Sequence, residues 1–140
     1  IDLGIAMQLT NIARDVCEDK ERNRQYVRHD FFSIQEIIKE SQIFYENSFS
    51  SIRNIPFRSR FSVLVARRVY RKIGDNILKQ KNIDNYNKAG KIYVPTFEKL
   101  IQTFLSIFDL IKLLFIKNLN HDNQANHNIL DQEINLNERI

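Results

Sequence analysis

Three oxygen-bearing side chains recur at four-residue intervals near the start of the chain: Asn11, Asp15 and Asp19. In an α-helix a step of four residues advances only slightly beyond one turn, so this spacing predicts that the three side chains lie on one stripe of a helix. Amide and carboxylate oxygens suit a hard cation such as Mg²⁺, which usually completes its shell with water and substrate phosphate. The stripe therefore indicates half of a Mg²⁺ site for a phosphorylated substrate, with Mn²⁺ as the alternative ion.

A solvated charged helix face is the alternative interpretation of this stripe, as it is for most runs of charge. Two features favour the metal site. The residues before the acids are mostly apolar, which predicts a largely buried helix. Asp15, Glu18 and Asp19 also lie toward the end of that helix, where its dipole disfavours anions. Arg14 alone is too little to neutralise this cluster, so it invites bound cations.

The same segment resembles the second aspartate-rich motif of the squalene and phytoene synthase family, most closely that of its bacterial phytoene synthases. The stretches that carry the resemblance are residues 3–19, Arg24, Tyr26, Val27, residues 66–73, Tyr86, residues 92–95, Lys99 and Leu100. They cover about residues 1–100. The resemblance says less about the remaining part of the chain.

The family resemblance implies an all-α fold, the C-terminal part of an isoprenoid-synthase-type helical bundle. It implies a Mg²⁺-dependent head-to-head condensation of two prenyl diphosphates. The first choice is two geranylgeranyl diphosphates giving phytoene through a cyclopropyl diphosphate intermediate, the first step of carotenoid biosynthesis. The alternative is a squalene- or dehydrosqualene-type synthase, which takes farnesyl diphosphate; the squalene type would add NADPH. No glycine-rich dinucleotide fingerprint is present, but the family binds NADPH without one.

The resemblance also implies roles for single residues at the metal and diphosphate site. Asn11, Asp15 and Asp19 match the family's metal-binding positions, and Arg14 matches its diphosphate-contacting arginine. Lys91 stands where the family usually has an arginine that also contacts diphosphate. Lysine keeps the charge but lacks the two-pronged donor geometry, so we expect weaker or rearranged diphosphate binding there.

Three further residues match positions around the reacting carbons. Tyr26 and Tyr70 match tyrosines that line the family's cavity near the diphosphates, and Gln8 is similar to a polar residue near the reacting carbons. Each tyrosine has an alternative interpretation as an ordinary packing residue. With Arg14, these residues form the predicted catalytic set.

In the family, the first aspartate-rich motif lies upstream on another helix and shares the metal ions. Nothing in residues 20–140 resembles that motif, and the chain starts at Ile1 without a methionine. We therefore expect a piece of a longer protein, or the product of a split or decayed gene, that needs the missing N-terminal half. The non-enzyme alternative is an inactive helical remnant that acts at most as an interaction module.

Composition bounds the remaining function classes. The single cysteine, Cys17, excludes an internal disulfide and fits a reducing, cytoplasmic compartment. The net charge of +4 and the pI near 9.3 raise the question of nucleic acid. The basic residues are dispersed, however, and no recognised motif interleaves them with aromatic residues, so we expect no nucleic-acid partner.

Only 3 glycines and 2 prolines interrupt the helical pattern, so the sequence predicts an all-α domain over residues 1–119. Four helices are expected: one to about residue 20, one from a capping box at Ser33 to before Pro56, one over residues 59–80 and one over residues 96–119. The expected connections are a charged segment over residues 21–30, a polar loop over residues 82–90 and a strand-like piece over residues 91–94. A flexible tail is expected over residues 120–140.

Two of these expected helices carry open questions. On the helix over residues 59–80, Gly74 indicates a close helix contact, and Arg67, Arg68, Arg71 and Lys72 form either a solvated basic face or a set of which one or two reach diphosphate. The helix over residues 96–119 is apolar but interrupted by polar residues, so it is not expected to span a membrane. It is either a core helix or a helix lying against a membrane, peripheral at the inner face of the cytoplasmic membrane.

Overall fold

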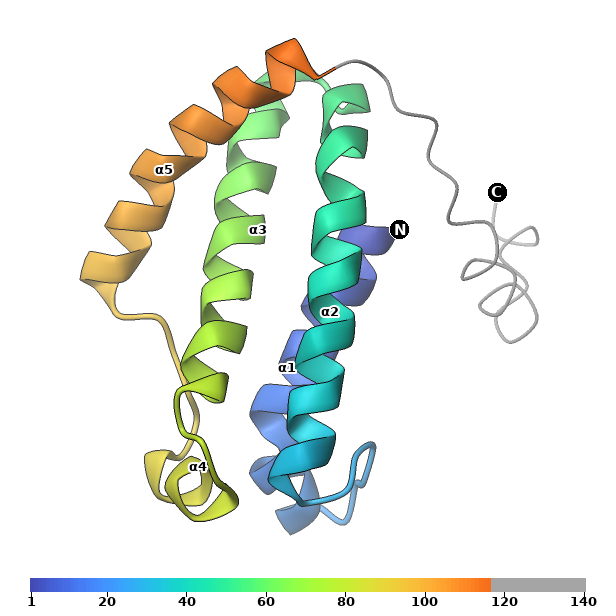
Figure 1. Ribbon diagram of the computed structural model, residues 1–140, viewed down its shortest axis with the longest axis vertical. Coiled ribbons are helices and arrows are strands. Elements are labelled where there is room, and N and C mark those ends of the chain that lie inside the picture. The colour runs from blue at the N-terminus through green and yellow to red at the C-terminus, as the bar shows by residue number, and fades with distance from the viewer. Residues whose placement is uncertain (117–140) are drawn as a thin grey trace, which may run out of the picture.

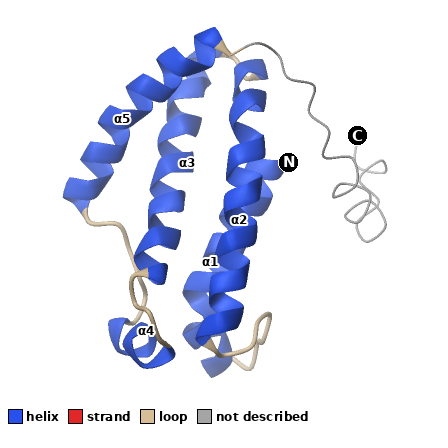
Figure 2. Cartoon of the chain, viewed as in Figure 1, coloured by secondary structure: helices blue, strands red, loops and turns tan. Residues whose placement is uncertain are grey.

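Helices form nearly all of the described part of the computed structural model, which comprises residues 1–116 (Figures 1 and 2). The elements are α1 (Asp2–Glu21), α2 (Phe31–Ser51), the 3₁₀ helix η1 (Ile52–Asn54), α3 (Phe57–Leu78), α4 (Ile83–Ala89) and α5 (Thr96–Phe115). No strand occurs within this range, so the all-α prediction is confirmed and the strand-like interpretation of residues 91–94 is wrong. The predicted tail, residues 120–140, and the domain boundary at 119 lie outside the described residues.

The arrangement of the long helices places the aspartate stripe on one side of the molecule and α5 on the other. Helix α1 packs against α2 and α3, while α5 packs against α3. Figure 1 shows α2 and α3 running side by side, with α1 behind α2 and α5 slanting across the outer side of α3. The short helix α4 lies at the same end of the bundle as the end of α1 (Figure 1).

The main core joins α1, α2 and α3 to the segment that follows α3. Its buried members are Ala13, Val16, Ile34, Ile38, Ile73, Ile77, Tyr86, Ile92 and Val94. A second cluster surrounds Ala6, Phe44 and Tyr45, and Tyr70 packs against both clusters. The small side chains of Ala6 and Ala13 let α1 approach its neighbours closely. The prediction of a largely buried helix holds only for one face of α1, because Leu3, Ile5, Met7, Leu9 and Ile12 are half-buried within residues 1–116.

The start of α2 differs from the predicted capping box at Ser33. The helix begins at Phe31, and Asp30 is the residue before it, in an extended conformation. The Asp30 carboxylate accepts hydrogen bonds from the Ser33 backbone N–H and the Ser33 hydroxyl, both at 2.8 Å. The capping-box prediction is therefore wrong, because Asp30 supplies the acceptor three residues earlier and Ser33 becomes its donor.

The segment predicted as a polar loop over residues 82–90 contains a helix instead. Asn82 caps α4 by accepting a hydrogen bond from the Asn85 N–H at 2.8 Å, and the helix ends at Gly90, whose φ of 63° suits glycine. Tyr86 is 1% exposed and holds α4 to the core. Tertiary packing of this one ring offsets the weak helix propensity of the surrounding asparagines.

Helix α3 confirms the expected close contact at Gly74. A β-carbon on Gly74 would lie 3.3 Å from Ile38 Cγ2 on α2, tighter than an ordinary contact. The apolar residues of α3 face the core: Leu64, Ile73 and Ile77 are buried, and Phe61, Val65 and Val69 are half-buried.

Helix α5 is not a core helix within residues 1–116, because Ser106 and Leu113 are its only buried residues there. Its outward face carries the large exposed side chains Phe97, Leu100, Ile101, Phe104, Ile107, Phe108, Ile111, Leu114 and Phe115. No helix in the described range is long and apolar enough to cross a bilayer.

Candidate functional site

The three predicted metal ligands all lie on α1 and are half-buried. Helix α1 buries Ala6, Thr10, Ala13 and Val16, and the oxygen-bearing stripe flanks this buried face. Asp19 lines a cavity of 180 Å³ whose wall also includes Tyr26. The helical stripe that the four-residue spacing predicts is therefore present, with its last carboxylate at the edge of a small cavity.

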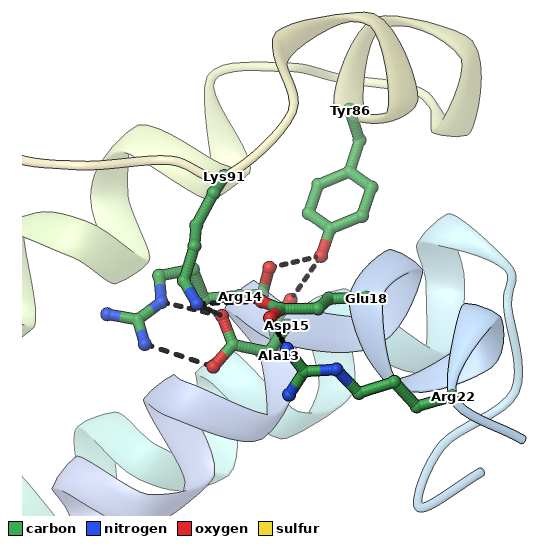
Figure 3. Close-up of polar contacts among 7 residues, drawn as sticks. All are labelled: Ala13, Arg14, Asp15, Glu18, Arg22, Tyr86 and Lys91. Atoms are coloured by element: carbon green, nitrogen blue, oxygen red, sulfur yellow. Dashed lines mark hydrogen bonds and ion pairs between the residues drawn. The ribbon is translucent and has the colours of Figure 1, made fainter. Parts of the chain in front are cut away.

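Asp15 is held between two cationic side chains (Figure 3). Arg14 grips both of its oxygens, with Nε–Oδ1 at 2.9 Å and Nη2–Oδ2 at 3.0 Å. Lys91 Nζ lies 3.4 Å from the same Oδ1. Partial burial opposes ionisation of this carboxyl, but the Arg14 hydrogen bonds and the charges of Arg14 and Lys91 outweigh it and lower the pKa of Asp15.

Lys91 joins the segment after α4 to a second carboxylate on α1. Its Nζ donates to Glu18 Oε2 at 2.7 Å, and Arg22 Nη2 lies 2.6 Å from Glu18 Oε1. The hydrogen bond between Lys91 and Glu18 lowers the pKa of Glu18 and raises the pKa of Lys91. Sequence reasoning missed this role of Glu18, because its partner Lys91 lies 73 residues away in the chain.

Tyr86 fixes α4 to the backbone of α1 (Figure 3). Its hydroxyl donates to the carbonyl oxygens of Ala13 and Arg14, each at 2.8 Å. Burial raises the pKa of Tyr86, so its hydroxyl stays protonated as a donor. The sequence signal for this residue is a single large aromatic among polar residues, and it was noted only through the family resemblance. Tyr86 thereby holds Lys91 near the acidic residues.

Asn11 carries the clearest sign of an unfilled ligand position. Its Oδ1 is buried and has no hydrogen-bond partner within the described residues. Buried polar atoms normally have a partner, so an orphaned acceptor on the predicted stripe fits the chemistry of a cation ligand. No group of three histidine, cysteine, aspartate or glutamate residues within residues 1–116 is placed to hold a metal ion. The donor types therefore fit Mg²⁺, while this stretch supplies only part of a coordination shell.

The predicted catalytic residues divide into two groups. Arg14 lies in the cluster with Asp15 and Lys91, and half-buried Tyr70 packs nearby against the two apolar clusters. Gln8 is exposed, and Tyr26 is 65% exposed in the connection after α1. Neither of these two touches the Arg14–Asp15–Lys91 cluster within the described range.

The basic residues of α3 lie apart from this cluster. Arg67 is only 6% exposed, so a solvated basic face is wrong for this residue. Arg67, Arg68, Arg71 and Lys72 line a cavity that shares no residue with the one beside Arg14 and Asp15. The α3 arginines therefore do not extend the candidate site on α1.

Comparisons with known proteins agree with the part of the chain that carries the stripe. The family model for squalene/phytoene synthase matches residues 1–33. A 15-cis-phytoene synthase of Synechococcus elongatus is 33% identical over 119 residues, which cover 70% of this chain and 38% of that protein. A chloroplastic phytoene synthase of an Oncidium hybrid cultivar is 30% identical over 122 residues, 72% of this chain and 29% of that protein.

A bacterial relative, the 15-cis-phytoene synthase of Enterobacter agglomerans, is 30% identical over 98 residues, which cover 55% of this chain and 33% of that protein. The chain thus spans about a third of the length of the curated relatives it matches. No solved structure matches it. The matched segment contains Asn11, Arg14, Asp15 and Asp19 on one helix, and on these grounds the chain belongs to the squalene/phytoene synthase family.

Proposed function

We propose that this chain supplies one metal-binding helix and part of the diphosphate site of a Mg²⁺-dependent enzyme that joins two prenyl diphosphates head to head. The observation that carries the proposal is the unpartnered, buried Asn11 Oδ1 on the same stripe as Asp15 and Asp19. The relatives named phytoene synthase favour geranylgeranyl diphosphate as substrate and phytoene as product. A squalene-type reaction with farnesyl diphosphate and NADPH is the alternative within the family.

In this proposal Asn11, Asp15 and Asp19 hold Mg²⁺, with further ligands from substrate phosphate and from protein outside the described residues. The bound ion neutralises the diphosphate and makes it a better leaving group. Arg14 and Lys91 donate hydrogen bonds to the diphosphate oxygens, a role supported by their present contacts with the oxygens of Asp15 and Glu18.

Departure of the diphosphate leaves an allylic carbocation that must be kept from water. Tyr70, which packs against both apolar clusters, would present an aromatic face that stabilises positive charge without acting as a nucleophile. Tyr26 and Gln8 are exposed within residues 1–116, and in this proposal the N-terminal part of the protein covers them.

The exposed face of α5 supports a peripheral position at the inner face of the cytoplasmic membrane. Nine large apolar side chains on this face have exposed fractions between 40% and 82%. A helix with one apolar face lies in the membrane interface rather than across it, where a C40 product would also partition.

Metal binding by the 140-residue chain tests the proposal directly. Mn²⁺ titrated in the presence of inorganic diphosphate, followed by electron paramagnetic resonance, should bind the chain. Asp15→Asn and Asp19→Asn should each weaken binding by about tenfold or more, since each removes a charged ligand. Glu40→Gln, at an exposed position on α2, serves as the control and should change little. Equal Mn²⁺ affinity for all four proteins would remove the metal site from the proposal.

In this proposal, activity requires the part of the relatives that the chain does not span. We would join the chain to the upstream part of the Synechococcus elongatus relative and supply geranylgeranyl diphosphate with Mg²⁺. A C40 hydrocarbon supports the phytoene reaction, and a C30 product from farnesyl diphosphate supports the squalene-type alternative. A folded chimera that binds metal and makes neither product would contradict the enzyme proposal.

One observation favours the second candidate, an inactive interaction module. Arg14 already holds both oxygens of Asp15, so each oxygen has a hydrogen-bond partner without any metal ion. The Mn²⁺ titration separates the two candidates, because a module without a metal site gives no Asp15-dependent binding.

A further inference from the structure

A second charged site lies between α2, α3 and α5, away from the aspartate stripe. These helices enclose a cavity of 610 Å³, a size typical of small-molecule sites. Five cationic and three carboxylate side chains line it, which leaves a surplus of two positive charges. The cationic side chains are Arg67, Arg68, Arg71, Lys72 and Lys112.

The carboxylates in this cavity compensate only part of that charge. Asp109 accepts hydrogen bonds from Arg68 at both of its oxygens, with Nη2–Oδ1 at 2.9 Å. Glu46 is largely exposed and lies 3.7 Å from Arg71, whose Nε donates to Gln42 instead. The third carboxylate, Asp75, is exposed and forms no ion pair within residues 1–116. The remaining cations therefore line the cavity with only part of their charge compensated.

Arg67 is the most informative of these cations. It is 6% exposed, and its guanidinium lies 4.9 Å from the centre of the Phe49 ring. Its Nε donates to the Tyr45 carbonyl oxygen at 2.9 Å, and this is the only hydrogen bond of its side chain within residues 1–116. The four N–H groups on its two terminal nitrogens therefore have no hydrogen-bond acceptor within residues 1–116. Arg67 forms part of the cavity wall. A largely buried arginine that has free donors on a cavity wall and no carboxylate partner within residues 1–116 is suited to bind an anion.

The electrostatics of Arg67 agree with its geometry. Burial, together with the neighbouring positive charges of Arg71 and Arg68, lowers the pKa of Arg67 to about 10. Lys72 and Lys112 form no ion pair in the described range, and Lys112 Nζ lies 5.8 Å from the centre of the same Phe49 ring. Three cations without a carboxylate partner thus share one cavity.

We infer that this cavity binds a phosphate-bearing anion, at a site distinct from the metal and diphosphate site on α1. Phosphate suits the site because an arginine presents paired donors that match two phosphate oxygens, while lysines add point charges. Phe49 and Leu105 form a small apolar part of the wall, so the ligand carries little apolar surface beside its phosphate group. This inference does not depend on the proposed condensation reaction.

Inorganic diphosphate without any divalent cation is the probe. We would titrate it into the 140-residue chain and follow backbone amide signals by two-dimensional NMR. The inference expects saturable shifts in residues 67–72 of α3 and 102–112 of α5. Shifts confined to residues 8–19 of α1, or no saturable shift at all, would overturn it. The location of the shifts therefore separates this site from the proposed catalytic one.

Matched variants identify the groups that bind. Lys72→Met combined with Lys112→Met should weaken diphosphate binding by about tenfold, since it removes two charged donors at the rim. Arg67→Lys keeps the charge and loses the paired donors, so it should weaken binding by a similar factor while the fold, checked by circular dichroism, is retained. Lys39→Met is the control, because Lys39 is exposed on α2 and pairs with Glu36. Unchanged affinity in the double lysine variant would contradict the inference.

The phosphate group has two sources, a free small molecule or a lipid headgroup. Co-sedimentation with phosphatidylcholine vesicles, with and without phosphatidic acid, distinguishes them. Binding that requires phosphatidic acid and is lost in the double lysine variant identifies a headgroup. Saturation by free diphosphate with no added effect of phosphatidic acid identifies a small anion.

Discussion

The acidic cluster on α1 and the basic cavity beside α3 differ in how far their half-buried charges are paired with opposite charges. On α1, two carboxylates have cationic partners: Arg14 and Lys91 for Asp15, and Lys91 and Arg22 for Glu18. Beside α3, Arg68 is paired with Asp109, while Arg67, Lys72 and Lys112 have no carboxylate partner within residues 1–116.

The difference teaches how to interpret a cluster of charge in a folded chain. A cluster that satisfies itself is stable without a ligand, so a ligand must compete with existing bonds. A cluster with surplus charge and unspent donors is already prepared for a ligand. On this criterion the Asp15 and Glu18 part of the α1 site is the more self-sufficient, although Asn11 Oδ1 has no partner within the described residues. The cavity beside α3, of which the sequence shows only the run of basic residues, is the less satisfied one.

The largest effect should come from removing the Tyr86 side chain, which fixes α4 to the backbone of α1. Tyr86→Ala deletes a fully buried ring and should lower the free energy of unfolding by about 3–5 kcal/mol. Tyr86→Phe keeps the ring and should cost only about 1 kcal/mol for its hydrogen bonds. Urea unfolding measures both. Tyr93→Ala, at a 63% exposed position, is the control, and an equal loss there would show that Tyr86 is not a special anchor.

The second-largest effect concerns the Arg68–Asp109 ion pair in the basic cavity. In a double-mutant cycle, Arg68→Met and Asp109→Leu should show a coupling energy of about 1.5–3 kcal/mol, because both oxygens of a partly buried carboxylate are engaged. The exposed Glu36–Lys39 pair is the reference and should give about 0.2–0.5 kcal/mol. Equal coupling in the two cycles would mean that burial adds nothing to the Arg68–Asp109 pair.

A smaller effect should appear in the pH dependence of the α1 cluster. The pKa of Asp15 is lowered in the folded state, so its contribution to stability is complete above its unfolded pKa and is lost as the pH falls through the folded value. Asp15→Asn should therefore cost about 1 kcal/mol at pH 7, a cost that disappears as the pH falls below the ordinary pKa of an aspartate and through the lowered folded value.

Urea unfolding at several pH values gives this profile. Glu18 has a lowered pKa for a related reason, so the variant retains part of the acid dependence. Glu40→Gln is the comparison at an exposed position. A difference between wild type and Asp15→Asn that stays constant down to pH 2 would contradict the pairing of Asp15.

The smallest effect concerns Lys91, the position at which the family resemblance leads us to expect an arginine. Lys91→Arg restores the paired donors and should tighten diphosphate binding in the presence of Mn²⁺ by about threefold. Lys91→Met should weaken it. Isothermal titration calorimetry measures both, and Lys39→Met again is the control. Weaker binding by the arginine variant would show that the segment after α4 is shaped for lysine.

Much of the fold followed from local pattern. The four-residue spacing placed Asn11, Asp15 and Asp19 on one helix, and the helices over residues 59–80 and 96–119 are present with boundaries shifted by a few residues. Helix starts were less predictable, because Asp30 and Ser33 are both good capping residues and only the tertiary structure selects between them. Helix α4 was missed because its stability comes from Tyr86 in the core rather than from its own residues.

The site was less accessible to sequence reasoning than the fold. Contacts such as Lys91 with Glu18 join residues 73 positions apart, and no local spacing encodes them. The four basic residues in the middle of α3 look alike in sequence and line one cavity, yet Arg67 is buried, Arg68 is bound to Asp109, Arg71 donates to Gln42, and Lys72 forms no ion pair within residues 1–116. Their separate environments arise from the packing of α2 and α5 on either side of α3.

The hydrogen bonds of Tyr86 to the α1 backbone also bear on the order in which the helices fold. Its hydroxyl closes a loop of 73 residues onto the Ala13 carbonyl oxygen, whereas the Thr10–Tyr45 hydrogen bond between α1 and α2 closes one of 35. Doubling the loop length adds about 0.6 kcal/mol of closure entropy, and contacts that are distant in sequence are slower to form. We therefore expect the α1–α2 pair to assemble first and α4 to dock onto a helix that is already in place. In native-state hydrogen exchange, the amides of α4 should accordingly open before those of α1.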